Sequence, residues 1–178
     1  MSGLKKIHNP KWHSIRKAIL LRQKLQHKNQ TLVLTNGCFD LLHIGHIYFL
    51  EEASKLGEVL WVLLNSDNSI KKLKGTSRPI QTIDERAYAL SALNCINGII
   101  PFEAKRITME IQTLKPDVYV KAGDYSLNTI DKTERQALET VGAKIQFLSF
   151  LPGYSTTTLI ERIYRSAAPQ SQHDSTTE

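Results

Sequence analysis

Two histidines spaced by about one helical turn form the segment with the clearest capacity for chemistry. His43 and His46 lie three positions apart with Gly45 between them, after an apolar, β-branched run that ends near Gly37. Residues three apart share one face of a helix. The start of a helix favours anions, because its amide groups are free and its dipole is positive there. We predict that both imidazoles face a phosphate and donate hydrogen bonds to its oxygens as charge builds in a transition state.

A histidine pair alone would also fit a zinc site or ordinary packing, so the surrounding sequence has to decide. Gly37 lets backbone amides approach a phosphate closely, and Gly45 leaves out a side chain that would block a ligand. The chain contains neither a Walker A sequence nor GxGxxG, which excludes both of these phosphate-binding loops. Asp40 is the nearest candidate carboxylate for a cation, with capping of the following helix as the alternative.

A cluster of cations follows the second apolar run of the chain. Lys71, Lys72, Lys74 and Arg78 lie within eight residues, in a polar stretch at residues 65–78 that we predict to be a loop. A solvated loop would have a similar composition. At the ligand-binding edge of a sheet, however, these cations favour a phosphate clamp.

Hydroxyl groups gather where the last predicted helix begins. The segment runs Gly153, Tyr154, Ser155, Thr156, Thr157, Thr158. Its hydroxyls and free amides suit a further phosphate contact. Simple capping of the helix by Ser155 is the other interpretation, and the two are compatible.

The order of the predicted elements defines the fold class. Continuously apolar runs predict strands at residues 31–35, 59–64, 99–100, 117–121 and 145–148. Helical spacing and end signals predict helices at residues 10–27, 44–56, 84–93, 104–114, 130–141 and 155–165. This alternation predicts a doubly wound, Rossmann-like α/β fold, a parallel sheet of about five strands with helices on both faces. Ligands bind at the carboxyl ends of such strands, so the loops after residues 35, 65, 121 and 150 should converge.

Length and charge suggest how the chain is organised. Its 178 residues suit one domain, with a basic N-terminal helix packed on it (residues 1–30), the main domain at residues 31–165, and a disordered tail at residues 166–178. Of the formal charge of +6, residues 1–30 carry eight Lys or Arg and no acid. That segment is either a solvated helix face or a contact for nucleic acid or a membrane.

Several classes of protein are excluded by composition. Cys38 and Cys95 are the two cysteines, with no clustered spacing, which argues against a disulfide framework and a structural zinc site. No apolar run approaches the roughly 20 residues that span a bilayer, and the N-terminus lacks the apolar core of a signal peptide. We expect a cytoplasmic protein.

Six segments carry a resemblance to a known family. Residues 43–46 match the HxGH signature of the nucleotidyltransferase superfamily, in the HIGH form that class I aminoacyl-tRNA synthetases also use. The matching segments occur in order at residues 36–43, 65–67, 73–75, 78–80, 121–125 and 152–157. Over about residues 10–165 the chain resembles the D-glycero-β-D-manno-heptose 1-phosphate adenylyltransferases of ADP-heptose synthesis. It departs at Ile44, where relatives often have proline, and at Ala122, where they often have glycine.

The resemblance implies that ATP and heptose 1-phosphate give ADP-heptose and pyrophosphate, for the inner core of lipopolysaccharide. Many relatives are fused to a sugar kinase. This sequence contains no kinase segment, so we expect a stand-alone form whose substrate is made by a separate kinase. The partners would be small molecules, with no nucleic acid and no membrane, and the oligomeric state is left open between a monomer and a homodimer. Mg²⁺ would arrive on ATP, held mainly by phosphates and water, with no protein side chain as a metal ligand.

The resemblance also assigns roles to residues. His43, His46 and Lys74 would be catalytic, and Lys72 would help Lys74 to bridge the phosphates. The nucleotide would contact these residues together with Asn36, Gly37, Cys38, Phe39, Asp40, Gly45, Gly123, Asp124, Tyr154, Ser155, Thr156 and Thr157. The acceptor would contact Asn65, Asp67, Arg78, Lys121 and Tyr125.

Three rival functions remain at this stage. A glycerol 3-phosphate cytidylyltransferase would share the fold and mechanism, but its usual arginine-threonine pair before the Ser-Thr-Thr segment is absent. A synthetase would need a KMSKS-like segment and a tRNA-reading domain. A nucleic-acid-binding module built on residues 1–30 would leave the six internal segments unexplained, and a steep salt dependence of binding would reveal it.

Overall fold

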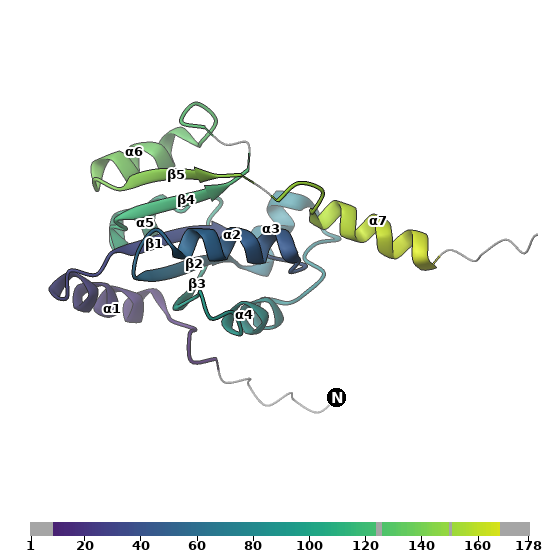
Figure 1. The fold of residues 1–178 in the computed structure, drawn as a ribbon, viewed down its shortest axis with the longest axis horizontal. Coiled ribbons are helices and arrows are strands. Elements are labelled where there is room, and N and C mark those ends of the chain that lie inside the picture. Colours follow the sequence, from purple (N-terminus) through teal and green to yellow (C-terminus); the bar gives the residue numbers. More distant parts are fainter. Residues whose placement is uncertain (1–8, 124–125, 150, 168–178) are drawn as a thin grey trace, which may run out of the picture.

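A parallel sheet forms the centre of the molecule. The computed structural model describes residues 9–123, 126–149 and 151–167 of the 178-residue chain. In this part of the chain the strands are β1 Leu32–Gly37, β2 Val59–Asn65, β3 Gly98–Phe102, β4 Val118–Ala122 and β5 Lys144–Leu148. They lie in the order β3-β2-β1-β4-β5, with every neighbouring pair parallel (Figure 1). The predicted Rossmann-like class is confirmed.

Helices cover both faces of the sheet. They are α1 Ile15–His27, α2 Ile44–Ser54, α3 Asp67–Lys74, α4 Ile83–Ser91, α5 Thr108–Leu114, α6 Lys132–Thr140 and α7 Thr156–Ala167. One core cluster joins the sheet to α1, α5 and α6, and the other joins it to α2 and α4. Figure 1 shows α7 extending away from the sheet, and none of its residues is buried.

The apolar runs of the sequence are explained by this double cover. Neighbouring residues of a strand point to opposite faces, so Leu63 of β2 packs in the first cluster and Leu64 in the second. Both are fully buried. Burying a leucine side chain stabilises the fold by roughly 1.5–3 kcal/mol, which is why a central strand carries apolar residues at every position.

The strand order reverses at β1. From β1 the chain builds β2 and β3 on one side and then crosses to β4 and β5 on the other. The hydroxyl of Thr35 in β1 donates to the carbonyl of Val120 in β4 at 2.8 Å, which ties the two strands together at this point. A crevice for a ligand is expected at the carboxyl ends of β1 and β4.

The prediction of a loop at residues 65–78 is wrong, because this stretch contains the helix α3. Ser66 caps the helix by accepting the amide hydrogen of Ser69 at 3.0 Å. Ile70 is fully buried and anchors the otherwise polar turns. The lysines hid this short amphipathic helix, since its one buried apolar residue gives little periodicity.

Other boundaries differ from the prediction as well, among them the start of α5 at Thr108 rather than near residue 104. The first helix begins at Ile15 rather than near residue 10, because Ser14 caps it and Trp12 instead forms a parallel bridge with Ile99. Strand β3 continues through Pro101, where the prediction ended it. β3 lies at the edge of the sheet, where the missing amide of a proline is tolerated.

Part of the basic N-terminal segment is used inside the fold. Arg22 is 6% exposed, and it pairs with Asp117 and donates to the carbonyls of Leu114 and Lys115. Lys11 donates to the carbonyl of Leu93 at 2.8 Å. These contacts hold α1 and the residues before it against the domain.

The C-terminal helix α7 continues two residues beyond the predicted end, to Ala167. The rest of the predicted tail lies outside the described residues. Within the described ranges, no helix combines the length and apolar character needed to cross a bilayer.

Candidate active site

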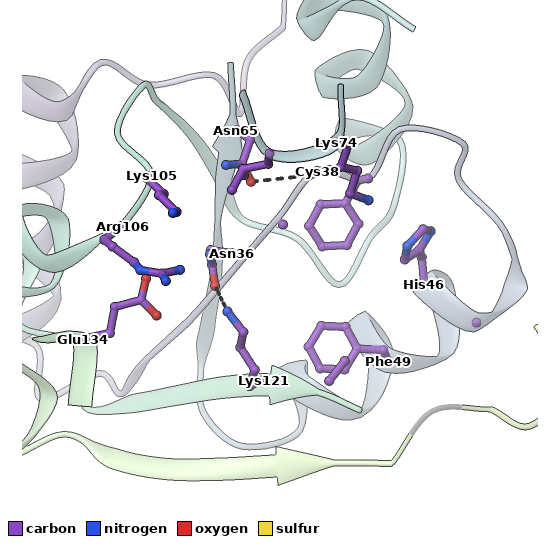
Figure 2. Close-up of a pocket in the computed structure, with 15 residues that line it drawn as sticks. Asn36, Cys38, His46, Phe49, Asn65, Lys74, Lys105, Arg106, Lys121 and Glu134 are labelled. Atoms are coloured by element: carbon purple, nitrogen blue, oxygen red, sulfur yellow. Dashed lines mark hydrogen bonds between the residues drawn. The ribbon is translucent and has the colours of Figure 1, made fainter. Parts of the chain in front are cut away.

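Two cavities adjoin at the carboxyl edge of the sheet. The inner cavity, of about 370 Å³, is lined by Asn36, Gly37, Cys38, Phe39, Gly45, His46, Phe49, Asn65, Leu73, Lys74, Lys105, Arg106, Lys121, Ala122 and Glu134 (Figure 2). The outer cavity, of about 460 Å³, is lined by His43, His46, Lys74, Leu151, Pro152, Gly153, Tyr154, Ser155, Thr156, Thr157 and Thr158. His46 and Lys74 line both cavities. These two side chains therefore mark the boundary where two ligands would meet.

The histidine pair lies at the start of α2, as its spacing predicts. His43 is the N-cap residue, with an extended backbone and no side-chain capping bond. Its ring stacks on that of His46, with centroids 3.8 Å apart and an angle of 23° between the planes. The Nδ1 atom of His43 is buried without a hydrogen-bond partner among the described residues.

His46 is held in the neutral form. Burial, the neighbouring His43 and Lys74 lower the pKa of His46 from 6.5 to about 4. Burial also lowers the pKa of His43. Near pH 7 the stacked rings therefore carry no repelling charges, and each can donate one N–H to a phosphate oxygen.

The lowered pKa of His46 predicts a pH dependence of stability. In the unfolded chain His46 binds a proton below about pH 6.5, whereas the folded protein binds it only near pH 4. The unfolded state thus holds more protons in this window, so the free energy of unfolding should fall as the pH falls from 6.5 to 4. One pKa unit corresponds to about 1.4 kcal/mol, which puts the His46 contribution at no more than about 3.5 kcal/mol.

Urea unfolding of the wild type and His46→Gln between pH 4 and 7 would measure this contribution. Acidification should destabilise the wild type more than the variant, since all other titrating groups are shared. Parallel pH profiles for the two proteins would contradict the assigned pKa.

Phe39 braces His46 from the other side. Its ring meets that of His46 edge to face, with centroids 5.2 Å apart. Phe39 has a φ of 46°, an uncommon backbone conformation for a residue with a side chain. A Cβ atom on Gly37 would lie 2.8 Å from the Phe39 ring. Gly37 therefore makes room for this ring, in addition to the predicted approach of backbone to ligand.

Gly45 has a packing role that the sequence did not reveal. A Cβ atom at this position would lie 3.1 Å from the His43 ring and 3.3 Å from the Cβ of Tyr154. The missing side chain thus lets the His43 ring and the loop before α7 approach α2. Gly45 also lines the inner cavity, where the prediction placed a ligand.

A hydrogen-bonded group forms the floor of the inner cavity. The amide oxygen of Asn36 accepts hydrogen bonds from the hydroxyl of Tyr119 at 2.7 Å and from Nζ of Lys121 at 3.1 Å. Burial lowers the pKa of Lys121, and the charge of Glu134 opposes that shift. Strand β4 thus places the ammonium group of Lys121 beside β1, where the strand order reverses.

Asp40 lies outside both cavities and serves the structure around them. It is 2% exposed, and its carboxylate accepts from Arg78 and from the backbone amides of Ile80 and Gln81, at 2.8 and 3.0 Å for the amides. The alternative that Asp40 caps α2 is wrong, because His43 holds that position. The Asp40–Arg78 pair fixes the chain after α3 against the loop before α2.

Asp67 is likewise engaged away from the cavities. It pairs with Arg86 of α4, which is fully buried. Arg86 also donates to the carbonyl of Cys38 at 2.7 Å and to that of Asn65 at 2.9 Å. Of the five predicted acceptor residues, Asn65 and Lys121 line the inner cavity, Asp67 and Arg78 do not, and Tyr125 lies outside the described residues.

Of the remaining residues predicted to contact the nucleotide, some line a cavity, some do not, and one lies outside the described residues. Tyr154, Ser155, Thr156 and Thr157 all line the outer cavity, and Ser155 caps α7 by accepting the amide of Thr158 at 3.1 Å. Lys72 and Gly123 line neither cavity. Asp124 lies outside the described residues.

Sequence reasoning missed part of the inner cavity. The missed residues are Phe49, Leu73, Lys105, Arg106, Ala122 and Glu134. A signal was present, since the carboxyl end of the third parallel strand must meet the same edge as the others. The loop after β3 carries Lys105 and Arg106.

The described residues contain no group of three or more His, Cys, Asp or Glu side chains that could hold a metal ion. The oxygens of Asp40, the carboxylate nearest the histidines in sequence, are already engaged. The donor set around the cavities consists mainly of N–H groups, cations and hydroxyls, which suits a metal that arrives with its own phosphate ligands.

The arrangement is that of a nucleotidyltransferase, and the chain belongs to the cytidylyltransferase-like family, whose model matches residues 34–162. The bifunctional protein HldE of Syntrophotalea carbinolica is 44% identical over 136 residues, which cover 76% of this chain and 27% of that protein. HldE of Helicobacter pylori is 45% identical over 146 residues, 82% of this chain and 30% of the relative. The chain thus spans less than a third of the curated relatives it matches.

Solved structures agree on the fold. The lipopolysaccharide core biosynthesis protein from Thermoplasma volcanium aligns with a TM-score of 0.54 and 25% identity, over 68% of this chain and 97% of that one. Pantoate-beta-alanine ligase from Francisella tularensis gives a TM-score of 0.54 at 14% identity, over 86% of this chain and 78% of the other. The second likeness concerns the fold alone.

Proposed function

We propose that the protein transfers the adenylyl group of ATP to D-glycero-β-D-manno-heptose 1-phosphate, giving ADP-heptose and pyrophosphate. The observation that carries this proposal is the pair of adjoining cavities that share His46 and Lys74. In a transfer between two phosphates, the reacting phosphorus must lie where the two ligands meet. The shared side chains are an imidazole and an ammonium, which can stabilise charge on that phosphate.

The outer cavity suits the triphosphate. The start of α7 presents amides and the hydroxyls of Ser155, Thr156 and Thr157 to it, and His43 faces it from α2. The N-terminus of a helix attracts anions through its free amides and dipole. We assign the β- and γ-phosphates to these groups, with the α-phosphate beside His46 and Lys74.

The reaction is a displacement at phosphorus. An oxygen of the acceptor phosphate forms a bond to the α-phosphorus, the bond from that phosphorus to the bridging oxygen breaks, and pyrophosphate leaves with the electron pair. The attacking phosphate is already an anion at neutral pH, so no residue has to remove a proton. Catalysis then consists of positioning and charge stabilisation by His43, His46 and Lys74.

Mg²⁺ would enter with ATP and neutralise part of the triphosphate charge when bound. Its ligands would be phosphate oxygens and water, in keeping with the lining of the outer cavity, which contains no carboxylate. The side chains of this chain act on the phosphate oxygens that the metal leaves free.

The relatives support a heptose phosphate as the acceptor and a role in lipopolysaccharide synthesis. Bifunctional HldE proteins are 42–45% identical to this chain, and one structural neighbour is a lipopolysaccharide core biosynthesis protein. A kinase acting on a heptose would have to supply the phosphorylated acceptor. We further propose a cytoplasmic location, because ATP and sugar phosphates are available there.

Pyrophosphate release tests the proposal directly. The purified protein would be incubated with each of ATP, CTP, GTP and UTP, paired with heptose 1-phosphate, hexose 1-phosphates or glycerol 3-phosphate. We expect the fastest release with ATP and heptose 1-phosphate, and ADP-heptose as the product. If none of the sugar phosphates in the panel supports the release of pyrophosphate, the proposed class of acceptor is refuted.

Lys74 and Lys71 provide a matched comparison within α3. Lys74 lines both cavities, whereas Lys71, one turn earlier on the same helix, lines neither. Lys74→Ala should therefore lower kcat by roughly tenfold to a hundredfold, the range for losing a charge-assisted hydrogen bond. Lys71→Ala should change kcat by less than about threefold, because this lysine lines neither cavity and would not contact a bound phosphate.

Each alanine variant removes one positive charge, so the overall field changes equally in both. Steady-state kinetics with ATP and the best acceptor give the two kcat values. Equal losses in the two variants would show that α3 acts only through a diffuse positive potential.

A further inference from the structure

The end of the inner cavity furthest from His46 contains a buried carboxylate. Glu134, in the first turn of α6, is 4% exposed and lines the cavity. Its Oε1 atom accepts the backbone amide of Ile107 at 3.2 Å. Figure 2 shows Glu134 across the cavity from His46.

Cations surround this carboxylate on two sides. Lys105 and Arg106, from the loop after β3, line the same end of the cavity, and Lys121 approaches from β4 (Figure 2). Arg106 is oriented by an ion pair with Asp131, the N-cap residue of α6, at 2.8 Å. One hydrogen-bond acceptor, Glu134, and three cationic donors thus line the same end of the cavity.

The mixture of charges indicates which part of a ligand fits here. A phosphate or carboxylate would be repelled by Glu134, whose carboxylate only accepts hydrogen bonds. An apolar group would displace water from the charged side chains at this end of the cavity and offer them no hydrogen bonds in return, which is costly. A hydroxyl group both donates and accepts, so vicinal hydroxyls can bond to Glu134 and to the neighbouring cations together.

Position then selects which hydroxyls these are. The phosphate of the acceptor has to lie beside His46 and Lys74, where the two cavities meet. Glu134 lies at the opposite end, so the acceptor reaches it with the hydroxyls most distant from its phosphate. In a heptose 1-phosphate, these belong to the exocyclic side chain of two carbons. A hexose has only one carbon at this position.

We propose that Glu134, with Lys105 and Arg106, binds the distal exocyclic diol of the sugar acceptor and so selects a heptose over a hexose. This inference rests on the proposed function, because it takes the inner cavity as the acceptor site. On this proposal, the loop after β3 and helix α6 recognise the length of the sugar's carbon chain, and the HxGH segment does not.

The test is a cycle that pairs one substitution with one change in substrate. The wild type and Glu134→Gln are each assayed with β-heptose 1-phosphate and with β-mannose 1-phosphate, which lacks the terminal carbon and its hydroxyl. Hydrogen bonds to charged groups correspond to roughly tenfold to a hundredfold in affinity. The wild type should prefer the heptose in kcat/KM by a factor in that range, and Glu134→Gln should lose most of the preference.

Controls separate this role from a structural one. Glutamine keeps an oxygen that can accept the Ile107 amide, so the loop after β3 retains its support, and the KM for ATP should stay unchanged. Glu139→Gln removes an exposed charge from the same helix and should keep the preference of the wild type.

The outcomes distinguish the two proposals. Equal losses of kcat/KM for both sugars in Glu134→Gln would overturn the inference and make Glu134 a support for the loop. An unchanged preference in Glu134→Gln would overturn it as well. If the wild type uses no sugar 1-phosphate at all, the proposed function itself fails.

Discussion

Replacing heptose 1-phosphate by glycerol 3-phosphate should lower kcat/KM for adenylyl transfer by a factor on the order of 10⁴. The inner cavity, of about 370 Å³, lies within the size range of small-molecule sites, and buried or partly buried polar groups line it. Asn36, Lys121 and Glu134 lie where a sugar ring and its side chain would extend. Glycerol phosphate is too short to reach all of these groups, and a site built for hydroxyls rejects ligands that lack them.

The base of the nucleotide should also affect kcat/KM. In the proposed mechanism His43 and His46 would contact only phosphates, which all nucleoside triphosphates share, so selection for ATP has to come from other residues. The loop before α7, with Leu151, Pro152 and Tyr154, lines the outer cavity. It lacks the arginine-threonine pair of the glycerol 3-phosphate cytidylyltransferases, and we expect ATP to be used in preference to CTP.

Steady-state kcat/KM for the four pairings of ATP or CTP with heptose 1-phosphate or glycerol 3-phosphate measures both preferences. The ratio for the acceptors with ATP held constant isolates the inner cavity, and the ratio for the nucleotides isolates the outer one. If CTP with glycerol 3-phosphate is the best pair, the assigned substrates are wrong, while the phosphate chemistry at His46 and Lys74 still stands.

His46→Ala should lower kcat by about 10²-fold to 10³-fold, the usual cost of losing one preorganised donor to transition-state charge. His46 lines both cavities and is fixed between the rings of His43 and Phe39. Its geometry is therefore set before the substrates bind. Loss of the ring should change turnover far more than it changes the KM for either substrate.

Thermal unfolding must accompany these kinetics. The neutral ring of His46 is partly buried at a cleft, so the alanine variant should lose only a few degrees in Tm, as for about 1 kcal/mol in a domain of this size. His27→Ala, at the exposed end of α1, is the matched control and should keep full activity. A stable enzyme with normal kcat after His46→Ala would show that the histidine has a structural role only.

Local patterns in the sequence determined much of this protein. The apolar runs predicted every strand of the sheet, because residues buried on both faces have to be apolar whatever their partners are. The spacing of His43 and His46 placed them at the start of α2, since three residues make nearly one turn. The hydroxyls of residues 155–157 and the glycines near the histidines were recognised for the same reason, as each depends on a few neighbouring residues.

The tertiary structure decided which polar groups face a ligand. Asp40 and Arg78, and likewise Asp67 and Arg86, neutralise each other in pairs that join distant segments, and one member of each pair is buried. In the sequence Asp40, Asp67 and Arg78 looked no different from Lys74 or Lys121 as candidates for the site. The strand order brought Lys105, Arg106 and Glu134 to the far end of the inner cavity. Spacing along the chain specifies only local geometry, whereas the contacts of a charged side chain depend on which distant strands and helices pack beside it.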